Sequence, residues 1–162
     1  MLIRAYKHWL PVALWMGVIF IMSTDLGSGA HTSRLIEPLV RWIRPDTTPE
    51  EFERVHFLVR KSGHLAEYAV LTLLLLLTLK HSLPRPATTA KWSWPAAGLV
   101  LVTAAAYAAT DEWHQSFVPG RTATLRDVLI DSGGALLALA VMFSWQKFSP
   151  IGLRPQPTAP VR

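Results

Sequence analysis

The stretch SGHLAEYAVLTLLLLLTLK, residues 62–80, decides the fold, because its apolar run reaches membrane-spanning length only if one acidic residue is accepted. Residues 68–79 contain no Asp, Glu, Lys or Arg, and admitting Glu67 extends the run back to Ser62, which gives 18 residues. A spanning helix needs about 20 mostly apolar residues. An acid inside such a helix is costly and usually marks function or a buried pair. We therefore expect a spanning helix with ionisable side chains near its start.

Three further apolar runs have a similar character. Residues 8–24 and 92–110 are 17 and 19 residues long without a charged side chain. Residues 132–146 give only 15, and 19 when Asp131 is admitted and the run starts at Val128. Two of the four runs thus need one acid to reach spanning length, which is a second sign of a functional or paired intramembrane carboxylate.

These runs predict an all-α fold, a four-helix transmembrane bundle within one domain over residues 1–148. The expected spans cover about residues 8–24, 62–80, 94–111 and 128–146. Residues 149–162 hold four prolines, and we expect a disordered tail there. The first run also has the pattern of a signal peptide, with Ser28-Gly29-Ala30 as a small-residue cleavage site. We favour a retained helix, and cleavage stays the alternative.

The composition supports a membrane protein over a soluble one. Hydrophobic residues make up 51% of the chain and charged residues 17%, against roughly 25% charged in soluble domains. The absence of cysteine excludes disulfides, thiolate metal sites and a cysteine nucleophile. The net charge of +5 would suggest nucleic acid for a soluble protein, but in a membrane protein the location of the charges matters more. We therefore predict membrane lipids as partners, and no nucleic acid.

The segment between the first two runs is predicted to carry a short helix on the membrane surface. Residues 34–44, RLIEPLVRWIR, are basic and amphipathic, although Pro38 weakens the helical pattern. Thr48-Pro49-Glu50-Glu51 has the form of a capping box, so we expect a new helix to begin there and to continue into the second span.

The remaining polar residues fall on one side of the membrane. Alternating topology brings together the start of the second span, the end of the third span and the start of the fourth, whichever way the chain inserts. The candidate site residues at these positions are Lys61, His64, Glu67, Tyr68, Asp111, Glu112, Gln115, Arg121, Asp127 and Asp131. His64 and Glu67 are three residues apart on one helix, close enough for the carboxylate to orient the imidazole.

The basic residues of the short loops give the orientation. With the N-terminus inside, residues 80–91 carry three basic side chains on the inner side, and residues 111–126 carry two on the outer side. Because basic side chains in short loops favour the cytoplasmic side, we expect both termini in the cytoplasm and the polar cluster facing outward.

The polar motifs are similar to those of the VanZ-like family of small bacterial membrane proteins. The motifs are Lys61-x-x-His64-x-x-Glu67-Tyr68, then Asp111-Glu112-x-x-Gln115-x-Phe117-x-Pro119-Gly120-Arg121, then Asp127-x-x-x-Asp131-x-x-Gly134. The chain departs from the family with Asp131, where Asn is usual, and with Ala138, where Gly is common. The resemblance implies a multi-pass protein of the bacterial cytoplasmic membrane. The founding member of the family is linked to teicoplanin resistance.

Three functions compete for this cluster. In a binding module, an outward-facing site recognises a lipid-linked cell-envelope intermediate or a glycopeptide, with Lys61 and Arg121 contacting an anion. In an enzyme, His64 is a general acid or base oriented by Glu67, and Asp111 and Glu112 supply a second carboxylate. In a structural or transport-associated protein, the same charges hold the helices together. The residues that we assign to ligand binding rather than catalysis are Lys61, Tyr68, Gln115, Arg121, Asp127 and Asp131.

Each candidate also has a structural interpretation. Glu67 and Asp131 would pair with Lys61, Arg121 or Arg126 in a purely structural cluster. Asp127 suits a helix cap, whereas two acids at a helix C-terminus, Asp111 and Glu112, oppose the helix dipole and are the best non-structural signal. No H-x-x-x-H or H-E-x-x-H spacing occurs, so we predict no cofactor, and a divalent metal near His64 stays the alternative.

Overall fold

The computed structural model describes residues 2–82, 92–119 and 121–148, with side chains from residue 7 onward, and the predicted tail at 149–162 lies outside them. Within these ranges the fold is all-α, as expected, and has no strand. The elements are α1 (Leu2–Met22), the 3-10 turn η1 (Asp25–Gly27), α2 (Gly29–Ile43), α3 (Pro49–Ser82), α4 (Trp94–Gln115) and α5 (Leu125–Phe148).

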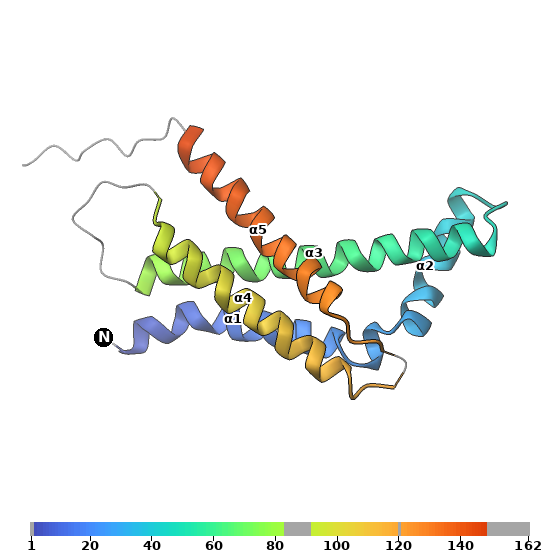
Figure 1. Cartoon of the computed structure of the whole chain (residues 1–162), viewed down its shortest axis with the longest axis horizontal. Helices are drawn as coiled ribbons and strands as arrows, with labels where there is room; N and C mark the ends of the chain where they lie inside the picture. The colour runs from blue at the N-terminus through green and yellow to red at the C-terminus, as the bar shows by residue number, and fades with distance from the viewer. Residues whose placement is uncertain (1, 83–91, 120, 149–162) are drawn as a thin grey trace, which may run out of the picture.

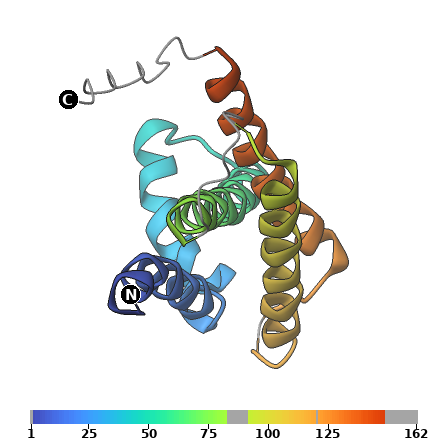
Figure 2. The ribbon, with the colours of Figure 1, turned by 90° about the vertical axis from the view of Figure 1, so that its left-hand side faces the viewer.

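Helix α3 is the axis around which the other helices are arranged. It contacts α1, α2, α4 and α5, and α4 also packs on α5 (Figure 1). The view along α3 shows it surrounded by the other helices (Figure 2). Its buried side chains Tyr68, Leu71 and Leu75 form the core together with Ile19 of α1 and Val100 of α4. The stretch that opened the sequence argument is therefore the centre of the fold.

Local sequence explains where the helices begin. The predicted capping box is formed at α3: the Thr48 hydroxyl accepts from the Glu51 amide at 3.3 Å, and the Glu51 carboxylate accepts from the Thr48 amide at 3.0 Å. Ser93 caps α4 through the Ala96 amide. Thr124 caps α5 through the Asp127 amide at 3.2 Å, so Thr124 is the cap and Asp127 lies in the first turn.

Helix α5 approaches α3 closely at Gly134. A Cβ added to Gly134 would collide with the backbone carbonyl of Leu65, so the two backbones touch there. Ala135 and Ala138 on the same helix are also buried. Small residues at the contact let helices approach closely, which is the usual way that helices associate in membranes.

The outer surface of the helices is apolar. Leu14, Leu99, Leu129, Leu136 and Val141 are all exposed large hydrophobic side chains, and they lie on α1, α4 and α5. A soluble monomer rarely exposes apolar area on this scale. This surface fits a lipid environment.

The length and hydropathy of the helices fit a membrane protein, but they establish fewer spans than the sequence predicts. Among the described residues, α3 and α5 are long and apolar enough to cross a membrane, and α1 with α2 adds a third span only if the two are counted as one, bent by 69°. Helix α4 is not among them. The four-helix transmembrane bundle therefore stays a prediction.

Helix α2 has the character expected of a surface helix. It extends from Gly29 to Ile43, further toward the N-terminus than the predicted 34–44, and it contains no buried residue. Its axis runs steeply across α3 rather than along it (Figure 1). Its Leu35, Leu39 and Trp42 side chains are exposed, as they would be for insertion into a membrane interface.

We expect Gly134→Ala to destabilise the protein by about 1–3 kcal/mol, because the added methyl group forces α5 away from the Leu65 carbonyl. The matched control is Gly133→Ala, since a Cβ at Gly133 meets nothing within 4 Å. The thermal midpoint in detergent micelles, followed by circular dichroism, checks this. Equal midpoints for the two variants would contradict the tight α3–α5 contact.

Candidate functional site

The predicted site residues gather at one end of the helices, where α3 passes the end of α4 and the start of α5. We use the name polar centre for His64, Glu67 and Tyr68 of α3, Asp111 of α4 and Asp131 of α5. Electrostatic interactions link these side chains to one another across the three helices. The topology argument thus correctly predicted which parts of the chain meet.

His64 lies against a carboxylate from another helix. Its Nδ1 atom is 3.4 Å from Oδ1 of Asp131, whose side chain is 0% exposed. Glu67, which the spacing favoured as the partner, interacts with His64 electrostatically, and no hydrogen bond joins the two side chains in the described structure. The imidazole–carboxylate pair therefore joins α3 to α5 rather than two turns of α3.

Asp111 is the hub of a buried hydrogen-bond network between α1 and α4. Its Oδ2 atom accepts from the Ser23 hydroxyl at 2.7 Å and from the Gln115 amide at 2.9 Å. All three side chains are buried. These bonds hold one oxygen of the carboxylate and fix the end of α1 against the end of α4.

Glu112 supports the beginning of α5. Its Oε2 atom accepts from the Thr124 amide at 2.9 Å, so an acid from the end of α4 lies at the N-terminus of another helix. Carboxylates are favourable there because they meet the positive end of the helix dipole. The unfavourable dipole that we expected at the end of α4 is thus offset by a favourable one at α5.

Arg121 closes the C-terminal end of α1. Its guanidinium donates to the carbonyl oxygens of Met22 and Thr24, the latter at 3.0 Å. Free carbonyls and negative dipole charge at a helix C-terminus attract such a cation. Burial, with some repulsion from Arg60, lowers the pKa of Arg121 from its ordinary value, yet a guanidinium stays protonated in proteins. A Cβ at Gly27 would lie 2.7 Å from this group, so Gly27 leaves room for it.

Lys61 pairs with Asp127 across the α3–α5 contact. Their side chains are 22% and 14% exposed, and a direct ion pair joins Nζ to Oδ1. The ammonium also lies 5.5 Å from the centre of the Phe57 ring. Lys61 therefore stabilises the start of α5, and its role toward an anionic ligand stays a prediction.

Several polar atoms of this region are buried without a hydrogen-bond partner in the described part of the chain. They are Tyr68 OH, Asp111 Oδ1, Glu112 Oε1, His114 Nδ1, Arg121 Nε and Asp131 Oδ2, whereas His64 Nδ1 and Asp131 Oδ1 lack an ordinary hydrogen bond but face each other at 3.4 Å. Native proteins leave few such atoms, and each costs about 1–3 kcal/mol when it is unsatisfied. These atoms are concentrated at one place, around the ends of α4 and α5 and the middle of α3.

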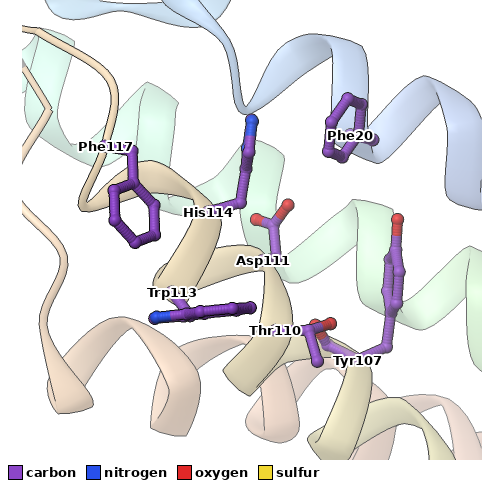
Figure 3. A pocket seen from close by; sticks show the side chains of 7 residues that line it. All are labelled: Phe20, Tyr107, Thr110, Asp111, Trp113, His114 and Phe117. Atoms are coloured by element: carbon purple, nitrogen blue, oxygen red, sulfur yellow. The ribbon is translucent and has the colours of Figure 1, made fainter.

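A pocket of about 290 Å³ opens beside this region, between α1 and α4. Its lining includes Phe20, Tyr107, Asp111, Trp113, His114 and Phe117. Figure 3 shows the Asp111 carboxylate directed toward α1, in the space between the His114 and Tyr107 side chains. The His114 ring packs on Phe20 with 4.2 Å between the centroids.

The metal alternative has no geometric support in the residues that the structure describes. No group of three or more His, Asp or Glu side chains there is arranged to hold a metal ion.

Sequence reasoning missed three of the groups that build this site. Ser23 and Thr124 bind Asp111 and Glu112, and His114 lines the pocket. Ser23 and Thr124 lie outside the helices that carry Asp111 and Glu112, so helical spacing carries no signal for these contacts. The i, i+4 spacing does bring Asp111 together with Gln115, since both lie on one helix.

The fold and the site together define a class: an all-α protein with helices of membrane-spanning length and a cluster of buried ionisable side chains at one end. Residues 8–146 match the VanZ/LLP1 family, so the chain belongs to that family, and the resemblance seen in the motifs is confirmed. No curated protein and no solved structure matches the chain.

We expect Lys61 and Asp127 to be coupled by about 1–2 kcal/mol in a double-mutant cycle with Lys61→Met and Asp127→Asn, because the pair is mostly shielded from solvent. The matched control is the exposed pair of Arg41 and Glu37 on α2, for which we expect about 0.3–0.5 kcal/mol. Unfolding in mixed micelles gives both values. Equal coupling in the two pairs would mean that Lys61–Asp127 does not hold α3 to α5.

Proposed function

We propose that all four long helices cross the bacterial cytoplasmic membrane, with the N-terminus and the end of α5 on the cytoplasmic side. Helix α4 has 22 residues, about 33 Å at 1.5 Å per residue, and it packs on both α3 and α5. The charge bias of the short loops supports this orientation. The polar centre is then on the outer side.

The function that the geometry supports best is ligand binding at this outer side. The polar centre, with Lys61, Glu112, Gln115, Arg121 and Asp127 around it, recognises the polar part of a lipid-linked cell-envelope intermediate or of a glycopeptide. The observation that carries this proposal is the concentration of buried polar atoms without partners. A ligand that supplies hydrogen bonds to them removes a cost that the protein otherwise bears.

The two ligand classes share one chemistry, since both are polar groups rich in hydroxyls, amides and carboxylates or phosphates that meet the protein at the membrane surface. Arg121 retains an unpartnered Nε, and Lys61 has ammonium protons beyond the one that Asp127 accepts. Both cations are therefore available to an anionic portion of the ligand. A link to teicoplanin resistance follows only if the ligand is the glycopeptide or its lipid-linked target.

A second candidate function rests on the His64–Asp131 pair. A buried carboxylate 3.4 Å from an imidazole is an arrangement that orients a general acid or base. In this alternative the protein cleaves or transfers a group of the lipid-linked substrate, with His64 moving the proton and Glu67, Asp111 and Glu112 near the reacting group.

The topology gives the first test. Because the chain has no cysteine, single cysteines at Ser82 and Ala123 can be labelled selectively. Both positions are exposed. We expect a membrane-impermeant maleimide to label Ala123→Cys in intact cells, and Ser82→Cys only after the membrane is opened. Labelling of both from outside would contradict a spanning α4.

The ligand gives the second test. We expect His64→Ala and Glu67→Gln to weaken binding of a lipid-linked peptidoglycan precursor to the purified protein by about tenfold each, as expected for the loss of one hydrogen bond to a charged group. The matched controls on the same helix are His81→Ala and Glu53→Gln, both at exposed positions. Microscale thermophoresis in nanodiscs, repeated with teicoplanin, measures the affinities.

The outcomes separate the alternatives. Weakening in the two site variants but not in the controls supports the binding module. Consumption of the precursor by the wild-type protein, abolished in His64→Ala, supports the enzyme instead. Unchanged affinity for both ligands in every variant, with no turnover, leaves the structural role and refutes both functions.

A further inference from the structure

The side chains that line the pocket between α1 and α4 are of a kind that the proposed function does not explain. Aromatic rings form most of it: Phe20 from α1, Tyr107 and Trp113 from α4, and Phe117 from the turn that follows α4. A single carboxylate, that of Asp111, belongs to the lining; none of the lining side chains is Lys or Arg, and the His114 imidazole, which also lines the pocket, packs on Phe20. The pocket thus combines π faces with one buried negative group (Figure 3).

The two carboxylate oxygens of Asp111 differ in their hydrogen bonding. Its side chain is buried, and its Oδ2 is held by Ser23 and Gln115. Its Oδ1 has no hydrogen-bond partner among the described residues. A buried carboxylate oxygen without a donor is costly, so a donor entering the pocket would be bound strongly.

The charge of the ligand follows from the aromatic lining and from the Asp111 carboxylate. Aromatic faces attract cations through their quadrupole, and quaternary or primary ammonium groups are the cations that aromatic-lined sites usually take. A buried carboxylate with one oxygen lacking a hydrogen-bond partner attracts the same groups and repels phosphate or carboxylate ligands. The neighbouring Tyr107 hydroxyl already donates to the Met16 carbonyl at 2.7 Å, so it does not serve Asp111.

The position of the pocket identifies the source of the cation. Trp113 and Phe117 are each 69% exposed, and they lie at the end of α4 where the polar cluster meets the outer apolar surface of the helices. Trp is typical of the membrane–water interface. A group that reaches this pocket therefore approaches from the lipid headgroup layer.

We propose that the α1–α4 pocket binds the ammonium group of a membrane lipid, such as an ethanolamine headgroup, between the Asp111 carboxylate and the surrounding aromatic rings. This inference rests on the proposed ligand-binding role of the outer face and adds the chemistry of one group. Asp111 belongs to both sites, but the aromatic rings do not contribute to the proposed site and His64 and Glu67 do not line this pocket, so variants of these residues test the two proposals separately.

Native mass spectrometry of the full chain tests the proposal. The protein is released from nanodiscs that contain equal amounts of phosphatidylethanolamine and phosphatidylglycerol with matched acyl chains. We expect retained phosphatidylethanolamine to exceed phosphatidylglycerol, and Asp111→Asn to reduce this preference about tenfold or more, which is the effect of losing a hydrogen bond to a charged group.

A second variant keeps the test independent of folding, because Asp111 also supports the α1–α4 contact. Trp113→Leu removes an exposed ring and keeps the surface apolar, and we expect it to weaken the preference about threefold. The matched control is Trp145→Leu on α5, whose side chain is 67% exposed, and it should retain the wild-type preference.

The proposal is overturned if the wild-type protein shows no preference for phosphatidylethanolamine. It is also overturned if Trp145→Leu reduces the preference as much as Trp113→Leu does. Loss of both bound lipids in Trp113→Leu would likewise overturn it, because that result describes a general lipid groove. Soluble ethanolamine at millimolar concentration is added as a competitor. If it displaces phosphatidylethanolamine, and the protein in phosphatidylglycerol nanodiscs loses no bound lipid, the site takes a free amine and a lipid headgroup is refuted as its ligand. An intact preference together with unchanged precursor binding in His64→Ala would refute the proposed function and leave this inference standing.

Discussion

The rest of the structure depends on the contact of two helix backbones, where α5 lies directly on α3. Gly134 permits this approach, since any side chain there would collide with the Leu65 carbonyl. One turn before Gly134, Asp131 is carried into the interface and meets His64. At the start of α5, the ion pair of Lys61 and Asp127 extends the same contact to the surface. Close packing and charge burial are thus one constraint, because a wider spacing would admit water between the two helices.

The ends of the helices are held by side chains from other helices. Glu112 of α4 binds the backbone at the start of α5, and Arg121 binds the backbone at the end of α1. Each places its charge where the helix dipole favours it. The segment that joins α4 to α5 is therefore held to the end of α1 by Arg121 and to the end of α4 through Thr124 and Glu112.

The sequence predicted the elements well and the partners poorly. Apolar runs with one acid located α3 and α5, and the capping box at Thr48 and Glu51 is where the sequence predicted it. Helical spacing could find pairs within one helix, such as Asp111 with Gln115. It could not find Asp131 as the neighbour of His64, or Thr124 as that of Glu112, because those contacts depend on how far one helix is shifted along another. The pattern of charges indicates that the ends of the helices meet. Which atoms come into contact there is determined by the packing of the helices.

The burial of Asp131 has a consequence for how the protein is made. A chain is synthesised from its N-terminus, so α3 with His64 precedes α5 with Asp131. Asp131 sits near the start of an apolar helix, where an isolated charge opposes insertion by a few kcal/mol. The imidazole beside which this charge lies belongs to a helix that is synthesised earlier. Burial of Asp131 in the observed arrangement therefore depends on the placement of a helix that precedes it in the chain.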